Sequence, residues 1–183
     1  MAEEDDHVGV VDIDGLAFTY EEYEQLKTLL HSERFRELAY SERRYFVLGA
    51  GDAERADRRQ FVADLLDGRS NAISFRLEDV GLTTDELPLW TAAYEILCDR
   101  ATHIVVVLED YDGGYVWELG YLFHDTVREK VWVLKREYGN EEMILKRYDN
   151  GMAASHVKVL ENAERTIPWT DSDDLGKGIE RIP

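Results

Sequence analysis

Residues 109–123, EDYDGGYVWELGYLF, bring together residue types with which proteins bind and transform small molecules. Glu118 stands between the large apolar residues Trp117 and Leu119, so it lies close to the buried face of a helix. An ionised carboxylate in such surroundings needs a partner or a ligand, or its pKa rises. Asp112 is near enough in the chain to share a pocket with Glu118 at the start of that helix. The two acids are therefore candidates for a functional pair.

The same stretch supplies further groups that suit a flat, polar ligand. Tyr111, Tyr115 and Tyr121 offer aromatic ring faces and hydroxyl donors. Asp110 adds a carboxylate at the start of the loop. We expect these four residues to contact a substrate.

A structural interpretation of the loop stays open beside the functional one. Asp110 or Asp112 is a suitable cap for the following helix, because its carboxylate can accept hydrogen bonds from free backbone amides. Gly113 and Gly114 supply backbone angles for a tight turn. Glu118, near the first turn of the helix, is favoured by the helix dipole.

The rest of the chain predicts the elements that position this loop. Apolar runs predict strands at 44–50, 72–80, 102–108, 130–136 and 155–160, and helical spacing predicts helices at 52–68, 86–101, 115–127 and 141–148. Strands that alternate with helices indicate a parallel sheet covered on both faces. We therefore predict an α/β fold, flavodoxin-like and doubly wound, with a mostly parallel five-stranded sheet.

Three segments are distinguished along the chain. Residues 1–42 are predicted to form an N-terminal helical extension, with a short strand or extended lead-in followed by a helix or helix pair over 19–39. Thr19 is its candidate N-cap, with Glu22 three residues later as the reciprocal partner. Residues 43–170 form the flavodoxin-like domain, and residues 171–183 form a tail.

Ligands of such sheets bind beyond the carboxyl ends of the strands, near the point where strand order reverses. The loop after the first strand of the sheet, GAGDAERADR, lies there. We expect Gly49, Gly51 and Asp52 to contact the substrate. Its arginines either clamp a phosphate or pair with neighbouring carboxylates.

Composition excludes several classes of function. The net charge is −18, with 39 acidic against 21 basic residues, which disfavours nucleic acids and anionic membranes as partners. Cys98 is the only cysteine and the five histidines form no metal-binding pair, so we expect no disulfide, no metal and no cofactor. An acidic start, MAEEDDH, is unlike a secretory signal, and a cytoplasmic protein is expected. The dispersed acidity resembles that of proteins from salt-loving archaea.

The segment DGGYVWELGYLF resembles the nucleoside 2-deoxyribosyltransferase family, in which an Asp lies six residues before the Glu of an E-L-G-Y helix. Asp112 and Glu118 occupy those positions here. The layout over residues 44–165 is also similar to that of TIR domains that cleave NAD. The helix WTAAYEILCDR departs from the family's pattern, because it has no clear counterpart of a second Asp.

The resemblance implies that Glu118 is a catalytic nucleophile on the anomeric carbon of a nucleoside or nucleotide. Asp112 would be the second catalytic residue, orienting the base or sugar or managing a proton. Tyr115 or Tyr121 would hold the Glu118 rotamer. A homo-oligomer is implied as well, because related sites are shared between subunits. The alternative is a non-catalytic nucleotide sensor or oligomerising interaction module with the same fold.

Overall fold

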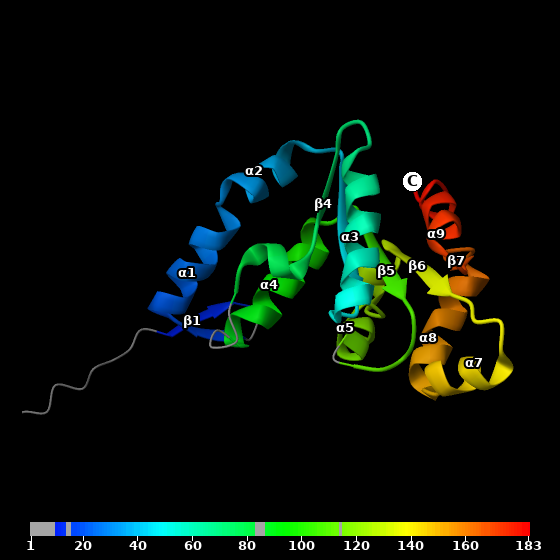
Figure 1. The fold of residues 1–183 in the computed structure, drawn as a ribbon. Helices are drawn as coiled ribbons and strands as arrows, with labels where there is room; N and C mark the ends of the chain where they lie inside the picture. The colour runs from blue at the N-terminus through cyan, green and yellow to red at the C-terminus, as the bar shows by residue number, and fades with distance from the viewer. Residues whose placement is uncertain (1–9, 14–15, 83–86, 114) are drawn as a thin grey trace, which may run out of the picture.

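The computed structural model of the protein describes residues 10–13, 16–82, 87–113 and 115–183 (Figure 1). Its strands are β1 (Val10–Ile13), β2 (Leu16–Thr19), β3 (Arg43–Gly49), β4 (Ala72–Phe75), β5 (His103–Leu108), β6 (Val131–Arg136) and β7 (Thr166–Trp169). Its helices are α1 (Tyr20–Leu30), α2 (Glu33–Tyr40), α3 (Ala53–Asp67), the 3₁₀ helix η1 (Leu77–Val80), α4 (Leu87–Arg100), α5 (Tyr115–Tyr121), α6 (Asp125–Arg128), α7 (Glu141–Arg147), α8 (Gly151–Asn162) and α9 (Ser172–Ile179).

Strands β3 to β7 form one sheet in the order β4-β3-β5-β6-β7, and each neighbouring pair is parallel. The register sets Val47 opposite Val105, and Val106 opposite Val133. The first strand of this sheet along the chain, β3, is therefore an inner strand. The next strand, β4, forms one edge, and β5, β6 and β7 follow in order on the other side of β3. This is the strand order of flavodoxin-like folds. The predicted fold class is confirmed, and the five strands are all parallel.

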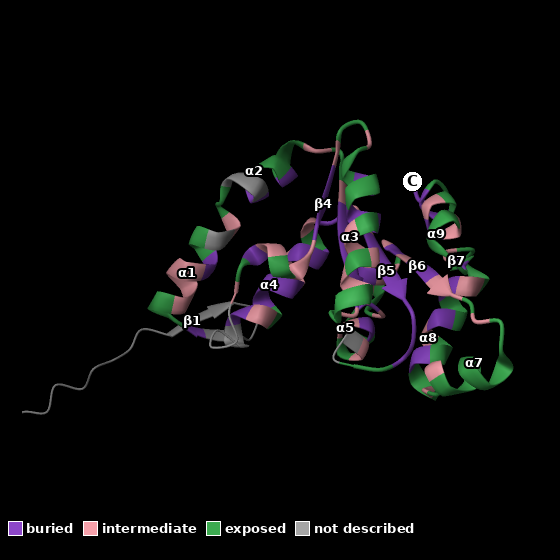
Figure 2. Cartoon of the chain, in the orientation of Figure 1, coloured by how far each residue is buried: buried purple, intermediate pink, exposed green. Residues whose placement is uncertain are grey.

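Alternate residues of the central strands feed two separate cores, because successive side chains of a strand point to opposite faces. Phe46 and Leu48 point toward a core completed by α1, α2, α4, α5 and α8. Tyr45 and Val47 point toward a second core completed by α3 and α9. Figure 2 shows β4 and β5 as buried between their helices, as expected for a sheet covered on both faces.

The N-terminal extension is a β-hairpin followed by two helices. Strands β1 and β2 pair antiparallel, and α1 and α2 are the predicted helix pair. The Thr19 backbone N–H donates to Glu22 at 2.8 Å, and the Glu22 N–H donates to Thr19 Oγ1 at 3.2 Å. The predicted reciprocal cap is therefore confirmed. Phe18 and Leu26 are buried in the first core, so the extension packs on the main domain, where α1 lies along α4 (Figure 1).

The strand predicted at 155–160 is wrong, because these residues belong to α8. Ala153, Val157 and Leu160 are buried at helical spacing, and the Asn150 side chain accepts a hydrogen bond from the Ala153 N–H as N-cap. Over six residues the alternation in SHVKVL fits a strand period as well as a helical one. The fifth strand is β7, at the sheet edge, where the exposed Pro168 is tolerated.

Two other boundaries differ from the predicted ones. The strand expected at 72–80 ends at Phe75, because Asp79 accepts a hydrogen bond from the Arg76 N–H and closes η1. The helix expected at 115–127 is divided into α5 and α6. Residues 171–183, interpreted as a tail, contain α9, whose Leu175 and Ile179 are buried against the sheet.

Candidate functional site

The switch point of the sheet lies between β3 and β5, since the chain leaves β3 for β4 on one side and crosses to β5 on the other. The loops that follow these strands meet at the same sheet edge. The first loop runs from Gly49 to the N-cap of α3, and the second runs from Glu109 toward α5. Ligands of open α/β sheets bind at this place.

Two buried carboxylates, Glu109 and Asp110, directly follow β5 and hold the two loops together. Glu109 is 3% exposed and accepts two hydrogen bonds from Arg58, at 2.7 and 2.9 Å, and one from Arg136 at 2.6 Å. The paired hydrogen bonds with Glu109 raise the pKa of Arg58. Buried carboxylates are stable only when paired in this way.

Asp110 is fully buried and accepts hydrogen bonds from Arg55 at 2.7 Å and from Arg147 at 3.0 Å. Its other oxygen accepts the Asp112 backbone N–H at 3.1 Å, which shapes the turn before α5. Asp110 does not line the cavity described next. The structure therefore gives Asp110 a supporting place, where the sequence predicted a substrate contact.

A cavity of about 770 Å³, hereafter the first cavity, opens at the switch point. It is lined by the ends of β3 and α3, by η1 and by the loop into α5. Its lining residues are Val47, Leu48, Gly49, Ala50, Gly51, Asp52, Arg55, Ala56, Arg59, Leu77, Glu78, Trp90, Asp112, Gly113 and Glu118. Its size is that of small-molecule sites. Both predicted catalytic acids lie in it, with three of the seven predicted substrate contacts, Gly49, Gly51 and Asp52.

Glu118 is half-buried on α5, and no residue that the structure describes forms a hydrogen bond or ion pair with its carboxylate. Burial raises the pKa of Glu118; Arg59 opposes this rise and Glu78 adds to it. The backbone beneath it is fixed, because the Tyr94 hydroxyl donates to the Glu118 carbonyl oxygen at 3.1 Å. The result is a desolvated carboxylate on a fixed helix, facing a cavity.

Arg59 connects the two sides of the first cavity. Its Nη1 donates to the Gly49 carbonyl oxygen at 2.8 Å, and its Nη2 pairs with Glu78 at 2.5 Å. Its Nε is buried and has no hydrogen-bond partner among the residues that the structure describes. A buried donor of this kind is costly unless a ligand or water accepts from it. Arg59 therefore joins the Gly49 carbonyl to Glu78 of η1 across the first cavity, while its buried Nε–H stays unsatisfied among the described residues.

Gly49 is the residue that lets β3 end at the cavity. It has φ +154°, and a Cβ atom at this position would lie 2.8 Å from the Val107 carbonyl oxygen. Asp52 is the N-cap of α3, accepting from the Arg55 N–H, and its carboxylate also pairs with the Arg55 guanidinium. Gly51 is exposed, with no heavy atom near the position of a Cβ.

Of the predicted tyrosine contacts, Tyr111 and Tyr121 do not line the first cavity. Tyr111 is 7% exposed and packs edge-on against Tyr148, with ring centroids 5.0 Å apart. Tyr121 lines a second, neighbouring cavity. The side chain of Tyr115 lies outside the described residues. The Asp112 side chain is exposed at the rim of the first cavity.

Glu78 and Trp90 were not predicted as cavity residues, whereas Arg59 was predicted, with Arg55 and Arg58, either to clamp a phosphate or to pair with carboxylates. The structure pairs Arg59 with the carboxylate of Glu78. Nothing local pointed to Glu78 or Trp90, which reach the cavity from η1 and α4. Only the pairing of β4 and β5 on either side of β3 brings them together.

Within residues 10–13, 16–82, 87–113 and 115–183, no cluster of three or more His, Cys, Asp or Glu side chains has the geometry to hold a metal ion. In the same part of the chain, no helix has the length and apolar character required to span a bilayer. Cys98 is fully buried in the first core, and burial raises the pKa of its thiol to about 12.

Comparison with known proteins gives a family without an assigned activity. No curated protein matches the sequence. A family model described as "Family of unknown function (DUF8170)" matches residues 10–165, which include the hairpin, both N-terminal helices and the whole candidate site. The match covers well over half of the 183 residues, so the chain belongs to the DUF8170 family.

Proposed function

We propose that the protein cleaves or transfers the N-glycosidic bond of a nucleoside or nucleotide, with Glu118 as the nucleophile. One observation carries the proposal: a desolvated carboxylate without a partner among the described residues faces a cavity at the switch point. A structural acid of a helix start is normally solvated or paired. Glu118 is half-buried and has no hydrogen-bond or ion-pair partner among the described residues, and perturbed groups of this kind concentrate at functional sites.

The chemistry follows that of retaining glycosidases. A Glu118 oxygen attacks the anomeric carbon of the sugar and forms a glycosyl ester while the carbon–nitrogen bond breaks. The base leaves with the bonding electron pair and takes up a proton. Water or a second base then attacks the same carbon and releases the Glu118 carboxylate. Asp112, at the rim of the same cavity, is placed to deliver or accept the proton.

The surroundings of Glu118 support a nucleophilic role. Loss of hydration makes a carboxylate oxygen more reactive, provided that it is ionised at the working pH. Arg59 lowers the pKa of Glu118 and so opposes the protonation that burial favours. The acids that line the first cavity can accept hydrogen bonds from sugar hydroxyls.

The first experiment incubates the protein with a mixture of nucleosides and, separately, with NAD, in high salt, and measures free base by chromatography. Glu118→Gln, Asp112→Asn and Glu54→Gln are run in parallel. Glu54 is a matched control, because its side chain is 88% exposed on α3 and does not line the first cavity. We expect base release from the wild type and from Glu54→Gln, and none from Glu118→Gln.

Two outcomes would contradict the proposal. Release of free base by Glu118→Gln at the wild-type rate would show that Glu118 is not the nucleophile. No release from any substrate by the folded wild type would favour the alternative, a nucleotide sensor or oligomerising module. Sedimentation of the wild type with and without nucleoside tests the expected homo-oligomer in the same samples.

A further inference from the structure

A second cavity of about 360 Å³ adjoins the first and has a different character. It shares Leu77, Trp90 and Glu118 with the first cavity. Its remaining lining residues are Thr91, Tyr94, Glu95, Trp117 and Tyr121. Where the first cavity is lined by glycines, acids and arginines, the second is walled mainly by aromatic rings. Glu118 stands at their common boundary.

Trp117 is the unusual residue of this wall, because its side chain is 87% exposed. An exposed indole beside a cavity leaves a large apolar face in water, on which a planar ligand can stack. The neighbouring Tyr121 is also partly exposed, at 36%. Both rings belong to α5, the helix that carries Glu118.

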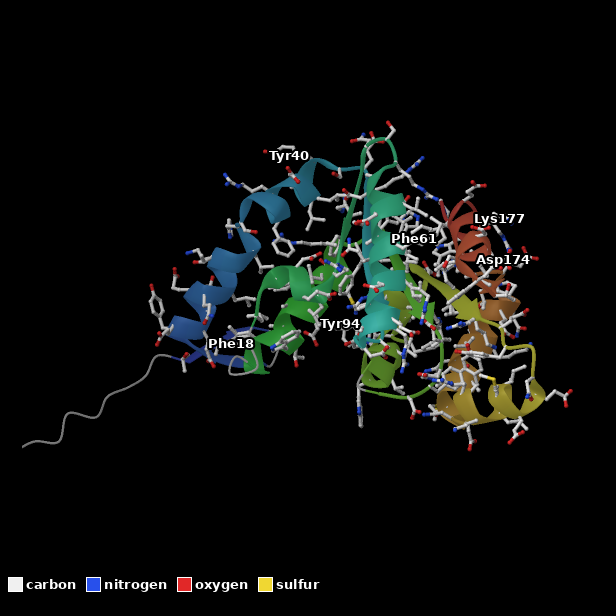
Figure 3. All side chains as sticks on the ribbon, in the orientation of Figure 1. Phe18, Tyr40, Phe61, Tyr94, Asp174 and Lys177 are labelled. Carbon is white, nitrogen blue, oxygen red and sulfur yellow. The ribbon has the colours of Figure 1, made fainter. Side chains whose placement is uncertain are left out.

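The opposite part of the wall is fixed to the sheet. Tyr94, labelled in Figure 3, is 7% exposed and packs on Phe46 of β3, with ring centroids 5.6 Å apart. Its ring meets that of Tyr121 edge-on at 5.5 Å. Burial raises the pKa of Tyr94 well above its ordinary value, so the hydroxyl stays neutral and keeps its bond to the Glu118 carbonyl oxygen. The second cavity therefore has one rigid and one exposed aromatic side.

The polar groups of the second cavity define the charge of its ligand. Among the described residues that line it, Glu95 and Glu118 are acids and none is basic. No described residue forms a hydrogen bond or ion pair with the Glu95 carboxylate. An anionic phosphate is disfavoured there by like charge. A neutral or cationic ring that carries an amino group can donate to Glu95.

We propose that the second cavity is the base subsite of the same ligand, and that it selects a planar base bearing an exocyclic amino group. The ring stacks on Trp117, its amino group donates to Glu95, and the sugar occupies the first cavity. Glu118 then lies beside the bond that joins base and sugar. The identity of the ligand as a glycoside rests on the proposed function, whereas binding of the base does not require any reaction.

Tryptophan fluorescence of the full-length protein, titrated with adenosine, inosine and ribose in high salt, tests the proposal. The variants are Trp117→Ala, Trp117→Phe, Glu95→Gln and Trp132→Phe. Trp132 is a matched spectroscopic control, because it packs against the second core on β6, away from this cavity. Far-UV circular dichroism checks that each variant folds, and Trp117→Phe keeps an aromatic ring where Trp117→Ala removes it.

We expect adenosine to quench the emission of the wild type and of Trp132→Phe. Trp117→Ala should weaken adenosine binding by about tenfold or more, the scale of one base–aromatic stack, and Trp117→Phe should weaken it less. Adenosine should bind more tightly than inosine in the wild type, and Glu95→Gln should remove that preference. The affinity for ribose should be the same in all variants.

Equal adenosine affinity in Trp117→Ala and the wild type would overturn the subsite. So would a dimer that Trp117→Ala dissociates without any change in nucleoside binding, since Trp117 would then be an interface residue. Chromatography of free base in the same samples separates the two proposals. If the wild type releases base and Trp117→Ala binds adenosine as tightly as the wild type, only the base-subsite proposal is contradicted. If Trp117→Ala loses adenosine binding and the wild type releases no base, only the proposed reaction is contradicted.

Discussion

The guanidinium of Arg58 on α3 holds the carboxylate of Glu109 at the end of β5 by two hydrogen bonds, Nε to Oε1 at 2.7 Å and Nη2 to Oε2 at 2.9 Å. This paired geometry fixes the direction as well as the distance between helix and strand. Arg55, one turn earlier, binds the adjacent Asp110. The two loops of the candidate site are thus held by neighbouring arginine–carboxylate pairs beneath the first cavity.

Replacing Glu109 with Gln should lower the free energy of unfolding by about 3 kcal/mol, because it leaves Arg58 and Arg136 without their buried counter-charge. Urea denaturation measures the change. Glu54→Gln is the control, since Glu54 also lies near Arg58, at 3.9 Å, but is exposed. Its effect should stay within about 0.5 kcal/mol. Similar losses in both variants would show that burial of Glu109 is not the cause.

Gly49→Ala should cost about 2 kcal/mol or more, because the new Cβ would lie 2.8 Å from the Val107 carbonyl oxygen and φ is +154°. The strain falls on the β3–β5 pair and would also alter the first cavity. Gly51→Ala, two residues later, meets no heavy atom within 4 Å and serves as the control. Thermal unfolding of the two variants gives the comparison, and an equal change in Tm would contradict the assignment.

Glu118→Gln should stabilise the protein at pH 7 while removing base release. Burial raises the pKa of Glu118 in the folded state, so ionising it costs more there than in the unfolded chain. The penalty is absent below the unfolded pKa of about 4.3, grows as pH rises toward the folded pKa, and is complete above it. We expect a gain in the free energy of unfolding at pH 7 and none near pH 3.5, measured by urea denaturation. A gain in the free energy of unfolding that does not change with pH would show that side-chain packing, and not the ionisation of Glu118, is its cause.

The two glycines of α9 should respond in opposite directions to alanine. A Cβ on Gly178 would lie 3.1 Å from Ile167 Cγ2 and 3.4 Å from Leu134 Cδ2, so Gly178→Ala should destabilise the protein by about 1 to 3 kcal/mol. A Cβ on Gly176 would lie 3.8 Å from Cζ of Phe61, which is an ordinary contact distance. Phe61 belongs to α3, and Figure 3 shows it beside α9. Gly176→Ala should therefore stabilise the helix by about 0.5 to 1 kcal/mol. Calorimetry of both variants decides the matter, and a loss in Gly176→Ala would contradict the packing described.

Features set by local sequence were predicted well. The Thr19–Glu22 cap depends on residues three apart, and the central strands of the sheet are marked by continuous apolar runs. The strand predicted at 155–160 is wrong, because the apolar spacing of these six residues fits a strand period as well as the helical period of α8. Features set by distant residues were not predictable. Asp110 is occupied by Arg147, 37 residues later, and Arg59 reaches the cavity of Glu118 only because β3 and β5 are neighbours.

The second core has a consequence for how the protein is made. Its face of the sheet, with Leu134, Ile167 and Trp169, is closed by Leu175, Ile179 and Ile182. Arg69 secures this closure by donating to the carbonyl oxygens of Ile179 and Ile182. These closing residues are translated after every strand of the sheet. The apolar residues on this face of the sheet therefore stay exposed to solvent until α9 has been synthesised and packs on them.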